Sequence, residues 1–227
     1  MTAILDMLVH WTPMLASGFV LNVGISFGAM AIGTVIGTLI GLGRLGHQAG
    51  LRRMLAMATH FCRNTPSIVL LFYLTYLLPF EVGLYGTVIQ IPAWSKAVIG
   101  LSVPVIGFMS DTIFGALRGI GSDQWEAATA LGYNRWQTLT RIILPQTVPL
   151  LLPPWMSYFA VIVMASSTAS MVGVREILSS ATMAMEAMTN SELVIPMYLY
   201  VLLWFFLFCY PISRLTRRME KRRWAPL

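Results

Sequence analysis

The sequence contains little charge. Only 11% of its 227 residues are Asp, Glu, Lys or Arg, whereas 57% are hydrophobic, and the mean hydropathy is +0.73. An ordinary soluble domain carries roughly 25% charged residues, most of them on its surface. The composition therefore excludes an ordinary soluble domain and indicates an integral membrane protein.

Residues that carry catalytic or metal chemistry are also scarce. The chain has three histidines and two cysteines, Cys62 and Cys209, which lie far apart in the sequence. No disulfide framework or metal cluster is predicted from them. A P-loop needs a Gly-Lys pair to bind nucleotide phosphates, and no Gly-Lys pair occurs. We predict no cofactor, no metal site and no enzymatic activity in this chain.

Long apolar runs are the main feature that is present. Five occur, at residues 17–43, 66–80, 97–109, 150–174 and 194–212. A helix needs about 20 residues to cross the hydrocarbon core. The second run reaches that length only with residues 61–65, and the third only with residues 110–117, so Arg63 and Asp111 come within or near the membrane. These runs predict an all-α integral membrane fold with about five transmembrane helices.

One transmembrane domain, 1–227, is expected. It divides into a short interfacial segment at 1–16, a five-span core at 17–213 and a basic tail at 214–227. An odd number of spans places the termini on opposite sides. Lys96 and Arg175 fall on one face, and most other basic residues fall on the opposite face: Arg44, Arg52, Arg53, Arg118, Arg135, Arg141, Arg214, Arg217, Arg218, Lys221, Arg222 and Arg223. The positive-inside rule makes the second face cytoplasmic and the N-terminus external. Because these residues flank apolar helices, no nucleic-acid partner is predicted.

A polar segment at 119–146 separates the third and fourth apolar runs. Residues 125–131 favour a helix, Gly132 can adopt the left-handed conformation that ends it, and Asn134 can cap a second helix that runs until Pro145. Two short helices joined by a tight bend fit a groove of another protein. An ordinary amphipathic loop is the alternative.

Several positions in this segment resemble the signature loop of binding-protein-dependent ABC importer permeases. They are Glu126, Ala127, Ala128, Gly132, Ile142, Leu144 and Pro145, at unbroken spacing. The resemblance extends over about residues 17–223. Arg63-Asn64-Thr65-Pro66 looks like the start of a membrane segment in the polar amino acid branch, the histidine, glutamine and arginine type, and Glu176-Ile177-Leu178 follows the fourth span as in that branch.

The resemblance implies a type I ABC importer permease fold in the bacterial cytoplasmic (inner) membrane. The segment at 119–146 is then the coupling helix, which docks on a cytoplasmic ABC ATPase dimer that binds ATP and Mg. A second permease subunit, identical or homologous, and a periplasmic or extracellular solute-binding protein complete the importer of a small polar solute. A secondary transporter or channel without an ATPase is the alternative, and the complete motif argues against it.

Polar residues within the apolar runs are the candidates for a solute pathway. Asp111 is the first: it can contact a cationic group of the solute, form a gate ion pair with Arg63 or Arg118, or lie at a helix end in water. The hydroxyl-bearing Thr65, Ser166 and Ser167 are further candidates. Such hydroxyls can instead bond to their own helix.

The chain departs from the related permeases at two of these places. Those permeases often carry arginine three positions after the acidic residue, where this chain has Phe114, and a Lys-Asp pair where it has Met164-Ala165. Both differences remove charge. Either the solute is less charged, or a partner permease holds the solute site.

Glycines recur along the first apolar run. They are Gly24, Gly28, Gly33, Gly37 and Gly41. Small residues at this spacing let another helix approach closely. We predict a packing role for them, since glycine brings no side chain to a solute.

Overall fold

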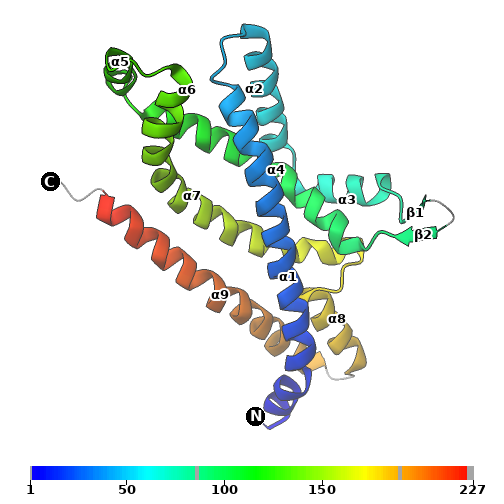
Figure 1. Ribbon diagram of the computed structural model, residues 1–227. Helices are drawn as coiled ribbons and strands as arrows, with labels where there is room; N and C mark the ends of the chain where they lie inside the picture. The colour runs from blue at the N-terminus through cyan, green and yellow to red at the C-terminus, as the bar shows by residue number, and fades with distance from the viewer. Residues whose placement is uncertain (1, 85–86, 189–190, 224–227) are drawn as a thin grey trace. The chain divides into compact units, whose positions relative to one another are not determined.

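A computed structural model describes residues 2–84, 87–188 and 191–223, which are mostly helical (Figure 1). The α-helices are α1 (Thr2–Gly43), α2 (Ala49–Asn64), α3 (Ser67–Leu77), α4 (Ala93–Gly119), α5 (Ser122–Ala130), α6 (Arg135–Thr138), α7 (Leu144–Ala165), α8 (Ile177–Ala187) and α9 (Val194–Arg223). A π-helical turn (Leu139–Ile143) joins α6 to α7, and 3-10 turns lie at Ser166–Val172 and Ser191–Leu193. Strands β1 (Glu81–Leu84) and β2 (Thr87–Gln90) form an antiparallel pair in which Val82 lies opposite Ile89.

Four helical segments of the described chain are long and apolar enough to cross a membrane: Asp6–Gly43, Ala93–Gly119, Arg135–Val172 and Val194–Lys221. Helix α3 is a shorter apolar helix. The predicted all-α membrane fold is confirmed, and the first, third, fourth and fifth predicted spans each lie within one of these segments or nearly so.

The second predicted span, residues 61–80, is not one helix. Helix α2 ends at Asn64, Thr65 is extended (φ −79°, ψ 129°), and α3 begins after Pro66. The proline ring disfavours the helical conformation of the residue before it, and proline is well tolerated at a helix start. The apolar run therefore continues through a break at Thr65.

The N-terminal segment 1–16, predicted as a separate interfacial helix, is in its described part the beginning of α1. Residues 2–43 form one continuous helix that includes Pro13. The interfacial position of its first turns stays a prediction.

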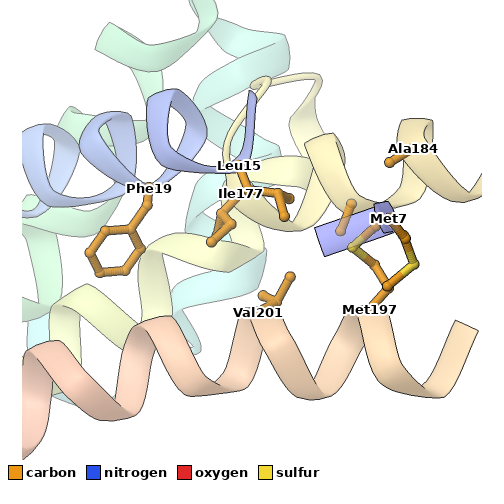
Figure 2. Packing of buried hydrophobic residues seen from close by; sticks show 8 residues of the cluster. Met7, Leu15, Phe19, Ile177, Ala184, Met197 and Val201 are labelled. Carbon is orange, nitrogen blue, oxygen red and sulfur yellow. The ribbon is translucent and has the colours of Figure 1, made fainter. Parts of the chain in front are cut away.

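The chain divides into two compact units, each described by itself. Unit 1 comprises Met1–Ala31, Pro66–Ser102 and Phe159–Ser213. Its apolar core joins the first part of α1 to α8 and α9 (Figure 2). Leu15 and Phe19 of α1 pack with Ile177 of α8 and with Met197 and Val201 of α9. Because lipid tails are as apolar as these side chains, close van der Waals packing between the helices holds this core together.

Unit 2 comprises Ile32–Thr65, Val103–Tyr158 and Arg214–Leu227. Glycines set the spacing of its helices. A Cβ atom at Gly37 would lie 2.8 Å from the Ile106 carbonyl oxygen, and one at Gly41 would lie 2.9 Å from the Ser110 carbonyl oxygen. The second half of α1 therefore packs directly on α4. The glycine spacing predicted such a close helix contact, and the structure identifies the partner as a helix of the same chain. Gly24, in the first half of α1, faces open space and does not take part.

Helix α4 meets α2 by the same device. A Cβ atom at Gly107 would lie 2.7 Å from the backbone nitrogen of Arg63 and 3.0 Å from the carbonyl oxygen of Thr59. Any side chain at Gly107 would separate the two helices. Two close contacts, α1 with α4 and α2 with α4, thus bring charged residues of three helices together.

Candidate functional site

The charged residues brought together in unit 2 are Asp111 of α4, Arg44 at the end of α1 and Arg63 of α2. Arg44 Nη1 donates to Asp111 Oδ1, and Arg63 Nη1 donates to Asp111 Oδ2, each at 2.7 Å. The carboxylate therefore has one guanidinium on each oxygen. Its side chain is 22% exposed, so it is not a fully solvated helix end.

The two arginines differ in their surroundings. The Arg44 side chain is 8% exposed and that of Arg63 is 58% exposed. Arg44 also lies 3.3 Å from the Ser110 hydroxyl, which is hydrogen-bonded at 2.8 Å to the hydroxyl of Thr59. Arg44 is thus held by several buried polar groups, whereas Arg63 contacts Asp111 from the exposed side.

The ion pair between Asp111 and Arg63, one of the two suggested by the sequence, is present. Arg118, the other suggested partner, does not pair with Asp111; its guanidinium lies 5.1 Å from the centre of the Phe114 ring. Arg44 lies over the same ring at 4.2 Å and was missed by sequence reasoning. Arg44 directly follows the apolar run 17–43, and this position was the feature of the sequence that could have indicated a role near the membrane. The Phe114 ring is thus a surface on which two guanidinium groups stack.

The hydroxyl candidates mostly bond to their own helices. Thr65 Oγ1 donates to the Phe61 carbonyl at 2.7 Å, and Ser167 Oγ donates to the Met164 carbonyl at 2.8 Å. Thr65 lies in unit 2 with Asp111, whereas Ser166 and Ser167 lie in unit 1. Ser166 is fully buried: it donates to the Val163 carbonyl at 2.7 Å and accepts from the side chain of Asn22 at 2.9 Å.

Asn22 leads to a second polar cluster that sequence reasoning missed. Asn22 Nδ2 donates to Glu176 Oε2 at 3.0 Å, and Asn22 Oδ1 accepts from the backbone N–H of Ile177 at 3.1 Å. Glu176 caps α8, since its carboxylate accepts from the backbone N–H groups of Leu178 (3.0 Å) and Ser179 (2.8 Å). Asn22 is an amide in an otherwise apolar run, and this feature of the sequence could have indicated the cluster.

Glu176 lies between the third and fourth candidate spans and is completely buried. Burial raises the pKa of its carboxyl above the ordinary value, and the three N–H donors act in the opposite direction. The donors are neutral, so this cluster fixes α8 to α1 and to the turn at Ser166 without a cation.

The predicted hairpin at 119–146 is formed within unit 2. Gly132 has φ +79°, the left-handed conformation predicted for it, and directly follows α5 and its capping residue. Asn134 caps α6: its Oδ1 accepts from the Gln137 N–H at 2.9 Å, and the Gln137 side chain accepts from the Asn134 N–H at 3.0 Å. The bend and the cap thus follow the sequence prediction.

The prediction that the second helix of the hairpin ends at Pro145 is wrong. The helix continues through the π-helical turn into α7, in which Pro145 is the second residue. The N–H of Leu144 bonds to the carbonyl of Leu139, five residues earlier. The wider π-helical turn shifts the backbone hydrogen bonds by one residue just before Pro145, which has no N–H group to donate.

The signature residues have different exposures. Glu126, Ala127, Gly132 and Pro145 are exposed, Ile142 and Leu144 are half-buried, and Ala128 is buried. Ala128 therefore packs inside the hairpin. Near the bend, Leu131 is 76% exposed and Trp136 is 71% exposed. Sequence reasoning did not single out these two exposed apolar side chains.

Comparison with known proteins identifies the family. Residues 51–224 match the family described as binding-protein-dependent transport system inner membrane component. A probable amino-acid ABC transporter permease protein of Bacillus subtilis, YckA, is 36% identical over 169 residues, which are 74% of this chain and 72% of that protein. The L-cystine transport system permease protein TcyB of the same organism is 26% identical over 211 residues, 92% of this chain and 86% of that protein.

Solved structures have the same fold. A chain of an amino acid ABC transporter crystallised with histidines superposes with a TM-score of 0.80 at 21% identity, covering 95% of this chain and 96% of that chain. A chain of the MetNI methionine ABC transporter in an inward-facing conformation superposes with a TM-score of 0.72 at 20% identity, covering 92% and 97%. The match over residues 51–224 places this chain in the binding-protein-dependent transport system inner membrane component family, the multi-pass permeases of ABC importers.

Proposed function

We propose that this permease imports a polar amino acid or a related small solute. Relatives named as permeases for amino acids, glutamine and L-cystine support this substrate class. The individual solute differs among these relatives, so the proposal names a class only. A second permease subunit, identical or homologous, and an external solute-binding protein complete the importer.

We propose further that the hairpin from Glu126 to Pro145 docks on a cytoplasmic ABC ATPase. The observation that carries the proposal is the shape of the hairpin itself. Gly132 sets the bend, the capping box of Asn134 fixes the next turn, and Leu131 and Trp136 are exposed beside them. A rigid polar hairpin with apolar side chains at its bend fits a groove on a partner. ATP is then hydrolysed in the partner, and this chain transmits the movement.

We propose an orientation from the distribution of charge. The ends of α1, α4 and α9 and the hairpin carry most of the arginines, and the positive-inside rule then supports a cytoplasmic hairpin and C-terminus and an external N-terminus. In a chain without Cys62 and Cys209, Ala187→Cys should react with an impermeant thiol reagent added to intact cells, and Arg218→Cys should not. The reverse pattern would contradict the orientation.

The coupling role is tested at two glycines of the hairpin. A Cβ atom meets no other atom within 4 Å at Gly132 or at Gly121, but only Gly132 has a positive φ; Gly121 has φ −53°. A β-branched residue strains the left-handed conformation by at least about 1–2 kcal/mol. We expect Gly132→Val to abolish ATP-driven uptake in proteoliposomes while the protein stays in the membrane, and Gly121→Val to transport normally.

Copurification of the ATPase separates the two ways in which Gly132→Val can fail. Loss of the ATPase from the purified complex indicates failed docking, and retention with no uptake indicates failed transmission of movement. Normal uptake by Gly132→Val would contradict the coupling role of the hairpin.

A further inference from the structure

A basic cavity lies beside the ion-pair site in unit 2, and nothing in the proposed transport mechanism uses it. Its volume is about 560 Å³, and no acidic side chain is among its described lining residues. Five arginines line it, together with Phe114: Arg44, Arg52, Arg53, Arg118 and Arg135. They come from the end of α1, the start of α2, the end of α4 and the hairpin.

The positive charge of this cavity is not neutralised by the ion-pair site. Asp111 is shared by Arg44 and Arg63, so one carboxylate faces two guanidiniums. Arg118 lies over Phe114, and Arg135 Nη1 is hydrogen-bonded to His47 Nε2, so neither contact brings a negative charge to the cavity. Arg52 and Arg53 are exposed and form no ion pair with any residue that the structure describes. Like charges held this close repel one another unless an anion lies between them.

Arginine clusters of this kind bind phosphate groups, because the planar guanidinium presents paired N–H donors to oxyanions. The cavity therefore has the charge and the donors for a phosphoryl anion. A free phosphate and the headgroup of an anionic phospholipid both provide that chemistry.

The surface of α2 beside the cavity favours the lipid as the source. Arg52, Arg53 and Ala56 of α2 line the cavity, and the adjacent face of the helix exposes Leu51 (44%), Met54 (60%), Met57 (71%) and Phe61 (65%). At 100° per residue these four side chains fall on one side of α2. An acyl chain along this face would continue from a headgroup held by the arginines. Basic pockets at the cytoplasmic ends of transmembrane helices are suited to such headgroups.

We propose that this cavity binds a phosphoryl anion, supplied by the headgroup of an anionic phospholipid of the inner leaflet. The assignment of the leaflet rests on the proposed orientation, whereas binding itself does not. The site joins α1, α2, α4 and the hairpin around one anion, so it links the bilayer to the elements that surround Asp111 and to the proposed coupling segment.

The chain offers a matched control, because a second Arg-Arg pair whose side chains the structure describes is also exposed. Arg52 and Arg53 line the cavity, whereas Arg217 and Arg218 lie on α9 and do not. The variants R52Q/R53Q and R217Q/R218Q lose the same charge. The experiment is native mass spectrometry of the purified, delipidated chain titrated in detergent with phosphatidylglycerol, phosphatidylcholine or inorganic phosphate.

We expect phosphatidylglycerol to bind in preference to phosphatidylcholine, and R52Q/R53Q to weaken its binding roughly tenfold or more, since each basic residue near an anionic headgroup contributes on the order of a factor of five. R217Q/R218Q should change the affinity for phosphatidylglycerol less than twofold. Displacement of the lipid by millimolar inorganic phosphate would support the phosphoryl site with a free anion as its occupant. Equal binding of both lipids without any phosphate effect, or equal losses in the two double variants, would overturn the proposal.

An acidic surface of the ATPase is the competing occupant. The same titration on the complex of permease and ATPase decides this point. Retained phosphatidylglycerol in the complex supports the lipid site. Loss of the lipid on ATPase binding, together with loss of the ATPase from R52Q/R53Q, would show that the arginines face the ATPase and would contradict the proposal. Neither result depends on transport, so failure here is separate from failure of the coupling role of Gly132.

Discussion

Two carboxylates in this permease are held by different kinds of hydrogen-bond donor. Glu176 of unit 1 is completely buried, and its donors are neutral: one side-chain amide and two backbone N–H groups. Asp111 of unit 2 is partly exposed, and its partners are two guanidinium groups, Arg44 and Arg63. Both are satisfied, but by different chemistry.

We expect this difference to separate a structural role, for Glu176, from a switchable one, for Asp111. Neutral donors attached to the backbone around Glu176 cannot leave without unfolding the start of α8, so this cluster is fixed. The ion pair between Asp111 and Arg63 connects two side chains, and Arg63 is 58% exposed. An exposed ion pair contributes only about 0–1 kcal/mol, so it can break and reform during a transport cycle. We expect substitutions at Glu176 to reduce stability and substitutions at Asp111 to reduce transport.

The largest effect is expected for Glu176→Ala. The substitution removes the cap of α8 and leaves the backbone N–H groups of Leu178 and Ser179 without this acceptor, while the side-chain amide of Asn22 keeps only Ser166. Donors left without a partner cost about 1–3 kcal/mol each, so we expect a loss of at least about 2 kcal/mol in the free energy of unfolding. The measurement is the apparent unfolding temperature of the purified protein in detergent. Glu186→Ala, at an exposed position of the same helix, is the control and should leave it unchanged.

If the unfolding temperature fell less for Glu176→Ala than for Glu186→Ala, the contrast drawn between Glu176 and Asp111 would be wrong. It would mean that the buried carboxylate of unit 1 is dispensable and that α8 is held by the apolar core of Figure 2 alone.

The second prediction compares the two partners of Asp111. Arg44→Gln removes the buried guanidinium, its contact with Ser110 and its stacking on Phe114, and we expect a loss of about 2 kcal/mol. Arg63→Gln removes one exposed contact and should cost less than about 1 kcal/mol. Unfolding temperatures of the two variants, measured side by side, test the difference. Equal losses of stability in Arg44→Gln and Arg63→Gln would show that the exposure of Arg63 does not weaken its ion pair with Asp111.

The third prediction concerns transport. Asp111→Asn keeps the size and one hydrogen-bond acceptor but removes the charge that holds both guanidiniums. We expect uptake in proteoliposomes to fall roughly tenfold, an effect of about 1.4 kcal/mol on the rate-limiting barrier, while the complex with the ATPase still assembles. Asp6→Asn, at an exposed acid of α1, is the control. Normal uptake by Asp111→Asn would show that the carboxylate is not part of the pathway.

Sequence reasoning predicted the features that depend on local backbone chemistry or on long composition signals. The bend at Gly132 needs a residue that accepts positive φ, and the cap at Asn134 needs an acceptor three residues before a glutamine. The apolar runs predicted most of the spans, and the glycine spacing of α1 predicted a close helix contact without identifying α4 as the partner. In each of these cases the cause lies within a few turns of the residue concerned.

The features that sequence reasoning missed depend on contacts between distant segments. Arg44 pairs with Asp111 across 67 positions, and Asn22 bonds to Glu176 across 154 positions. Lys96, expected in an external loop, is completely buried, and its ammonium group donates to the carbonyl oxygens of Thr75 (3.1 Å) and Leu78 (2.8 Å) at the end of α3. A single sequence shows the charge of such a residue but not its partner, because the partner is set by helix packing.

The smallest effect is expected at Ser167, and its neighbour Ser166 gives the contrast. Ser167 is half-buried and bonds only to its own helix, so Ser167→Val removes a local hydrogen bond and adds apolar bulk at a partly open position. Ser166→Val removes one of the two acceptors of the Asn22 amide, which also donates to Glu176, and places a larger side chain at a completely buried position.

If hydroxyls of this turn line the solute pathway, Ser167→Val lowers uptake by a few-fold and leaves the unfolding temperature unchanged. Ser166→Val lowers the free energy of unfolding by about 1–3 kcal/mol, and the unfolding temperature falls with it. Uptake and unfolding temperature of both variants provide the measurement. A Ser167→Val protein that transports at the normal rate would remove Ser167 from the pathway. The polar residues of unit 1 would then act in structure alone, and transport chemistry would belong to the charged cluster around Asp111 or to the partner permease.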